Sequence, residues 1–275
     1  MFSDTLRNIQ DDSLFGIEEA ARSIQRQDAS ERSGQAYTIA ALCHRRLAIC
    51  AVLLDARPDR FLAHLCHSAH ARLYFLRLVA GGHAAEPQYI CASKEFSFID
   101  AIAAGQYALS VDIAKLSARH HDPAHEYEDD FLLHHFLQQF FLKTIGATEA
   151  SPTSLSALLD RWKTVLEDGE DNYLEACRAL LEKQPLAFDE ALQAIIDARL
   201  LTFQKMSRSS GPEEELRKTE GALFMNGLAM LRLAELQGMQ TRSEYISIPS
   251  LSRIPAGQRA PTGAAWLVPQ PDWVD

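Results

Sequence analysis

A long apolar run opens at His120-His121-Asp122-Pro123-Ala124-His125-Glu126-Tyr127-Glu128-Asp129-Asp130-Phe131, and this run is the clearest indication of the fold. Asp122 is of a residue type that caps the free N–H groups at the start of a helix, and Pro123 fits the first helical position, where its missing N–H has no partner. The sequence therefore predicts a helix that begins here and continues to about Thr144, with Gly146 ending it.

The side chains of this predicted helix indicate that it lies in the middle of the molecule. Four carboxylates within five residues, turning 100° per residue, point around most of the circumference, so at least one of them must face protein. The apolar side chains that follow are too many for a single helix face. They are Phe131, Leu132, Leu133, Phe136, Leu137, Phe140, Phe141 and Leu142.

Apolar residues recur at three- and four-residue spacing over almost the whole chain of 275 residues, which predicts an all-α fold. We expect a multi-helix array of stacked antiparallel helical hairpins with an irregular Pro-rich C-terminal tail. In that tail, residues 245–249 alternate and are expected to lie extended, while Trp266 and Trp273 fix the tail to the helices. The predicted helices span residues 4–26, 33–56, 59–80, 96–104, 106–118, a segment starting at 151, 171–182, 185–203 and 212–238.

The length of the chain predicts one helical domain over residues 1–275, since a chain of this size can bury a full core. Within this domain, the sequence suggests three parts: N-terminal helices (1–90), a central helical core (91–240) and an extended tail (241–275). The hairpins are reminiscent of tetratricopeptide-like stacking, but no signature recurs at a fixed period, so a solenoid is not predicted.

Cysteine usage and hydropathy predict a reduced, cytoplasmic protein. The N-terminus has no apolar core of the signal-peptide kind, and no run of about 18 apolar residues is visible. We therefore expect neither export nor a membrane partner. The cysteines are odd in number and include no Cys-x-x-Cys pair: Cys43, Cys50, Cys66, Cys91 and Cys177.

The net charge of −10 lies entirely in the middle third of the chain. Residues 1–120 carry 13 acidic and 13 basic side chains, residues 121–200 carry 16 and 6, and residues 201–275 carry 8 and 8. Such a surface disfavours nucleic acid, which needs a basic footprint, and favours a basic protein partner. The alternative is a solvated acidic face that keeps the protein soluble.

A metal-dependent enzyme is the first enzymatic hypothesis to weigh, with His121, His125 and Asp130 as ligands. The sequence has no His-Glu-x-x-His and no Glu-x-x-His, the spacings of zinc and di-iron helices. A nucleophile elbow, a phosphate loop and a dinucleotide fingerprint are also missing, and a histidine row over residues 64–70 favours a polar helix flank over a ligand site. We therefore predict no catalysis and no cofactor.

Three short stretches share their order and spacing with a known family. They are Ala101-Ile102-Ala103-Ala104-Gly105-Gln106-Tyr107-Ala108-Leu109, Glu126-Tyr127-Glu128-Asp129-Asp130-Phe131, and Gly227-Leu228-Ala229-Met230-Leu231-Arg232-Leu233-Ala234-Glu235 followed by Tyr245-Ile246-Ser247-Ile248-Pro249. Together they resemble the bacterial polymorphic-toxin immunity proteins of the type numbered forty-nine, over the C-terminal two-thirds of the chain.

The resemblance implies a mainly helical protein that binds and neutralises a toxin encoded beside it. Toxins of such systems are often nucleases delivered by contact-dependent routes such as type VI secretion. A second helical immunity family, paired with nucleases of the restriction-endonuclease fold, is a near alternative. The charge agrees with this role, because the substrate groove of a nuclease is basic and a carboxylate-rich surface can cover it.

The predicted toxin-binding surface combines two acidic groups. The first group has a structural alternative, in which Glu128 or Asp130 is buried against Arg119 or Arg161. A helical adaptor that binds peptides on a concave surface is the other non-enzymatic hypothesis, and a homo-oligomer is left open. The residues of the predicted surface are Glu126, Glu128, Asp129 and Asp130 in the first group, and Glu167, Asp168, Glu170 and Asp171 in the second.

Overall fold

The computed structural model describes residues 2–147, 154–167, 169–206, 212–259 and 264–267. Within these residues the protein is all-α, as predicted, and contains one isolated β-bridge but no strand. The helices are α1 (Phe2–Arg26), α2 (Ala29–Ser33), α3 (Gln35–Asp55), α4 (Pro58–Ala80), α5 (Pro87–Ile90), α6 (Phe96–Ala103), α7 (Tyr107–Leu116), α8 (Glu128–Thr144), α9 (Leu155–Val165), α10 (Asn172–Glu182), α11 (Pro185–Lys205), α12 (Pro212–Lys218) and α13 (Met225–Leu236), with 3-10 turns η1 (Ala92–Lys94), η3 (Ser250–Ser252) and η4 (Ala264–Leu267).

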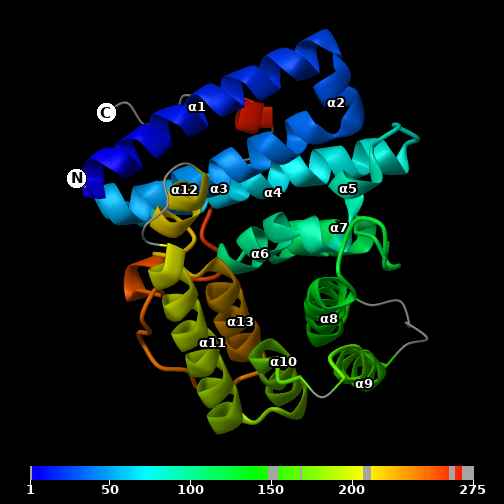
Figure 1. Cartoon of the computed structure of the whole chain (residues 1–275), viewed down its shortest axis with the longest axis vertical. Coiled ribbons are helices and arrows are strands. Elements are labelled where there is room, and N and C mark those ends of the chain that lie inside the picture. Colours follow the sequence, from blue (N-terminus) through cyan, green and yellow to red (C-terminus); the bar gives the residue numbers. More distant parts are fainter. Residues whose placement is uncertain (1, 148–153, 168, 207–211, 260–263, 268–275) are drawn as a thin grey trace.

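The helices form three tiers (Figure 1). The long helices α1, α3 and α4 pack side by side in the first tier, and the α6–α7 hairpin packs against α4 in the second. The third tier contains α8 to α11 and α13, with α13 packed on α6. Helix α8 contacts α7, α9, α10 and η1, so it is packed on several sides as its sequence predicted.

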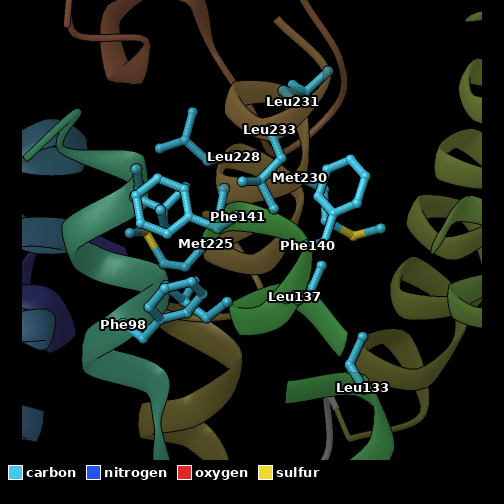
Figure 2. Packing of buried hydrophobic residues seen from close by; sticks show 14 of the residues in the cluster. Phe98, Leu133, Leu137, Phe140, Phe141, Met225, Leu228, Met230, Leu231 and Leu233 are labelled. Carbon is cyan, nitrogen blue, oxygen red and sulfur yellow. The ribbon is translucent and has the colours of Figure 1, made fainter. Parts of the chain in front are cut away.

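One hydrophobic core connects the tiers (Figure 2). Its members run from Ala48 in α3 to Ile254 in the tail. Phe141 of α8 is fully buried at its centre and meets Phe98 of α6 edge-on, with 5.8 Å between ring centroids. Leu228 of α13 packs in the same cluster. The central helix therefore joins the second tier to the third.

The central helix starts later than predicted, at Glu128 rather than at Asp122 and Pro123. Asp122 does cap a turn, since its Oδ1 accepts from the backbone N–H of Ala124 (3.0 Å), but the turn closes on itself instead of continuing into α8. The cause is distant in sequence. The backbone N–H of Ser93 donates to the Glu126 carboxylate (2.9 Å) and holds the loop against η1.

The prediction of a single helix over residues 212–238 is wrong, because the chain forms α12 and α13 with a turn between them. The backbone N–H of Phe224 donates to the carbonyl of Ser247 (2.7 Å), a tail residue, instead of to a helical carbonyl. Gly221, in the turn, lies so close to Phe203 that a Cβ would come within 2.9 Å of the ring. Packing with the tail and with α11 thus overrides the local helical pattern.

The helix predicted from residue 151 begins at Leu155 in the structure, where Ser154 caps it by accepting from the N–H of Ala157 (3.1 Å). Residues 151–153 lie outside the described residues. The neighbouring predictions are confirmed: Asp171 caps α10, and Pro185 opens α11.

The tail follows the prediction only in part. Tyr245 and Ile248 form a β-bridge and are both buried, so residues 245–248 make a tight turn instead of an extended segment. Ser247 has a positive φ of 64°, which produces the reversal. Trp266 is 3% exposed and lies beside Tyr74, with 5.6 Å between ring centroids, so it fixes the tail as predicted. Trp273 lies outside the described residues.

Helix α3 qualifies the expectation that no segment is long and apolar enough to span a membrane. Its length and composition alone would allow a crossing, and it is the single such helix in the described residues. However, 67% of its most apolar stretch is buried inside the protein, where α3 packs between α1 and α4. A buried core helix of a soluble protein has the same properties.

Replacing Gly227 by alanine is expected to destabilise the protein, although alanine is the better helix former. A Cβ at this position would overlap the Phe224 ring and come within 2.8 Å of Cδ1 of Ile248. Overpacking of this kind lowers the free energy of unfolding by about 1–3 kcal/mol. Urea unfolding of Gly227→Ala measures the loss, and the double variant Gly227→Ala/Ile248→Ala should lose less stability than the sum of the two single variants, because the smaller side chain makes room for the Cβ. A Gly227→Ala protein as stable as the wild type would contradict this packing.

Candidate interaction surface

Glu126 organises the loop that leads into α8. Its two carboxylate oxygens accept from the backbone N–H groups of Ser93 (2.9 Å) and Asp122 (3.3 Å). Its own carbonyl lies 3.0 Å from Nε2 of His121. Both oxygens are therefore engaged inside the protein, where Glu126 holds the loop against η1; its contact with a partner stays a prediction.

Glu128 is also engaged internally. Arg161 of α9 donates to both of its oxygens, from Nε (2.6 Å) and Nη2 (2.8 Å), in a bidentate pair. This hydrogen bonding holds the pKa of Glu128 below its usual range. The structural alternative is right about the partner, Arg161, and wrong about burial, because the pair joins α8 to α9 at the surface.

Asp129 and Asp130 are different, because within the described residues neither forms an ion pair. Asp130 is exposed by surface area, yet desolvation and the adjacent Asp129 raise its pKa. Glu126 and Asp171 raise it further, and Lys94 opposes them. These carboxylates repel one another, so their free energy falls when a cation approaches.

The two acidic groups of the predicted toxin-binding surface come close to each other at Asp171. Burial raises the pKa of Asp171, and Asp129 raises it further, so the N-termini of α8 and α10 carry neighbouring carboxylates. Asp171 itself caps α10 by accepting from the N–H of Tyr173 (2.8 Å). Glu167 and Glu170 are exposed, whereas Asp168 lies outside the described residues.

A pocket of about 430 Å³ adjoins Asp130. Tyr127, whose side chain is 79% exposed, forms one wall of it. We call it the Tyr127 pocket. Its lining residues are Ser93, Lys94, Pro123, Ala124, His125, Glu126, Tyr127 and Asp130.

The histidines near this surface are held by local hydrogen bonds. His121 contacts the Glu126 carbonyl, and Nδ1 of His125 lies 3.0 Å from Oδ2 of Asp122. In the described part of the chain, no group of three His, Cys, Asp or Glu residues is arranged to hold a metal ion. The hypothetical ligand set of His121, His125 and Asp130 is thus not brought together as a site.

Other histidines form a buried cluster that the sequence did not reveal. His44 of α3 lies between His64 and His67 of α4, with ring centroids 5.4 and 5.1 Å away, and its Nε2 donates to the carbonyl of Trp266 (2.8 Å). The expectation of a polar helix flank is wrong for His64 and His67, which are 7% and 9% exposed. Pairing of α3 with α4 buries them, and the tail covers His44.

Two buried ion clusters were also missed. Arg72 donates to both oxygens of Glu95, and both side chains are buried. Arg45 lies 2.8 Å from Glu220 and 3.5 Å from Asp100, and burial raises the pKa of Asp100 to about 6. The partners come from segments that are far apart in the sequence, so no local spacing signals these pairs.

The chain matches no known family model. Neither a curated protein nor a solved structure matches it. The immunity-protein resemblance therefore stays a prediction, and the roles of its motif residues come from the structure. Gly105, in the first motif, has φ of +65° and would bring a Cβ to 2.9 Å from Cα of Ala256, and Gly227, in the third, is packed against Ile248. Both motif glycines therefore lie where a side chain would clash with the C-terminal tail.

Proposed function

We propose that the protein is a cytoplasmic, non-enzymatic inhibitor that binds a basic protein partner, a nuclease toxin of a polymorphic-toxin system. One observation carries the proposal: Asp129 and Asp130, which form no ion pair within the described residues, lie in the first turn of α8 next to the exposed Tyr127, and Asp130 lines the same pocket as Tyr127. Charge that the protein leaves uncompensated supports a role in recognition.

The chemistry of the partner follows from the sign of this surface. Asp129, Asp130 and Asp171 repel one another, so a cationic surface that covers them relieves the repulsion and speeds association through long-range attraction. Exposed charges alone contribute little affinity. Tyr127 adds a large, exposed aromatic side chain of the kind that anchors protein interfaces.

The proposed contact residues are fewer than the sequence suggested. Glu126 and Glu128 are engaged by Ser93, Asp122 and Arg161, and Asp171 caps α10. The proposed contact set is Asp129, Asp130, Glu167 and Glu170, with Tyr127 as the aromatic anchor.

The double variant Asp129→Asn/Asp130→Asn is expected to associate at least 10-fold more slowly with the toxin encoded by the neighbouring gene, at low ionic strength. Raising the salt from about 50 to 300 mM should slow the wild type strongly and the variant little, since screening acts on the charges that were removed. Surface plasmon resonance measures the association rates of the wild type and the variant at each salt concentration. Asp11→Asn/Asp12→Asn, an exposed adjacent pair on α1, is the matched control and should behave as wild type.

Co-expression supplies the functional test. Cells that produce the toxin should survive when the wild-type chain is present and die when it is absent. A purified pair that does not associate even at low ionic strength would overturn the proposal. Equal salt dependence in the acidic variant and the wild type would overturn the electrostatic part of it.

A further inference from the structure

Tyr127 occupies a position where a tyrosine contributes nothing to the helix that it precedes. It is the N-cap residue of α8, a position that favours Ser, Thr, Asp or Asn, and its side chain makes no capping hydrogen bond. The side chain is 79% exposed. A residue that departs from local preference without a structural gain is expected at a functional site.

The Tyr127 pocket contains two carboxylates and one lysine, and the two carboxylates differ in their partners. The oxygens of Glu126 already accept from Ser93 and Asp122, whereas Asp130 has no ion pair in the described residues. The single lysine of the lining, Lys94, is exposed, and it acts on Asp130 against the repulsion of neighbouring carboxylates. The pocket is thus short of positive charge.

We infer that the Tyr127 pocket receives an arginine side chain of the basic partner, an inference that rests on the proposed function. A guanidinium is planar, so it can stack on the ring of Tyr127 while it donates two parallel hydrogen bonds to Asp130. An ammonium lacks both properties. The volume of about 430 Å³ accommodates the side chain together with water.

The arrangement also explains the place of the pocket within the acidic surface. Asp129 and Asp171 lie close enough to act on the carboxylates at its edge, so they attract the cation over a longer range than Asp130 alone. Tyr127 supplies the apolar contact that surface charges lack. The arginine is therefore the anchor, and the remaining carboxylates surround it.

Titration of the full-length, isotope-labelled protein with N-acetyl-arginine amide tests the inference without any toxin. The amide signals of residues 127 and 130 should shift saturably at millimolar ligand, and Asp130→Asn and Tyr127→Ala should each weaken binding by about 10-fold. N-acetyl-lysine amide should bind several-fold more weakly, and the uncharged citrulline analogue should not bind. Asp11→Asn, which changes an exposed carboxylate of α1 outside the lining and outside the proposed contact set, is the matched control.

Equal shifts with the arginine and citrulline compounds, or shifts that persist in Asp130→Asn, would overturn the inference. Both variants change exposed side chains, and an unchanged melting temperature would show that they are folded. The outcomes for the two proposals are separable. If the toxin binds the wild type but Tyr127→Ala and Asp130→Asn bind it equally well, the pocket inference fails and the proposed function stands.

Discussion

Lowering the pH from 7 to 5 is expected to remove most of the stability of the protein, because four buried histidines and the partly buried His134 are held neutral. Burial lowers the pKa of His44 to about 3 and the pKa values of His67, His134 and His135 to about 4, and that of His64 lies well below the usual range. The unfolded chain, with histidine pKa values near 6.5, binds protons that the folded chain does not, so stability falls as the pH falls below 6.5.

The size of this effect follows from proton linkage. Below pH 6.5, each histidine with a folded pKa of about 4 or lower costs the protein about 1.4 kcal/mol of stability per pH unit, which gives roughly 2 kcal/mol each at pH 5, and His64 acts in the same direction. Asp100 acts in the opposite direction, because its raised pKa of about 6 makes the folded state bind a proton between pH 6 and 4. One carboxylate offsets only a fraction of five histidines, and the sum is on the order of a domain's whole stability.

Urea unfolding at pH 7, 6 and 5, followed by circular dichroism, measures this loss. His134→Gln should lessen the pH dependence, since it removes one of the linked groups, although the substitution itself costs packing. His120→Gln, at an exposed position, should change neither stability nor its pH dependence. Equal unfolding midpoints at pH 7 and pH 5 would contradict the prediction that these histidines are neutral in the folded protein.

Glu95→Gln is expected to lower the free energy of unfolding by about 3–5 kcal/mol, because it leaves the guanidinium of Arg72 buried without its counter-ion. Arg72 and Glu95 are 2% and 0% exposed, and the pair joins α4 to the segment before α6. Arg72 also donates to the carbonyl of Tyr89 (2.6 Å), a bond that cannot replace the lost charge.

Chemical denaturation of Glu95→Gln measures the cost, and Glu128→Gln is the matched control. Glu128 has the same bidentate geometry with Arg161 but at the surface, so its loss should cost less than about 1 kcal/mol. Replacing both partners, as Arg72→Met/Glu95→Leu, should recover much of the stability, because no buried charge remains. Similar losses in Glu95→Gln and Glu128→Gln would show that burial does not set the energy of these pairs.

Periodicity predicted most helices correctly because their apolar stripes are local properties of the sequence. The errors occur where contacts between distant segments determine the position at which a helix begins or ends. Ser93 donates to Glu126 and delays the start of α8, while Phe224 donates to Ser247 and separates α12 from α13. Neither bond has a signature in the neighbouring residues.

The sequence predicted which part of the chain is acidic, but it did not predict which of the acidic residues are engaged by other residues of the protein. Charge counting identified the acidic third, and Arg161 was a named candidate partner for Glu128. The proximity of Asp171 to Asp129 depends on how α8 and α10 pack, which spacing cannot supply. The exposure of Tyr127 was missed, although a tyrosine before a helix start is itself an unusual choice.

The contact of Trp266 with the first tier has a consequence for how the protein is made. Its ring packs near Tyr37 and Tyr74, and its carbonyl accepts from His44. The packing of α3 and α4 therefore includes a residue that lies 222 positions after His44 in the sequence. Synthesis proceeds from the N-terminus, and α1, α3 and α4 leave the ribosome long before Trp266 does. A chain cut short during translation lacks this ring and leaves an aromatic surface uncovered, which marks it for the chaperones and proteases that recognise unfinished proteins.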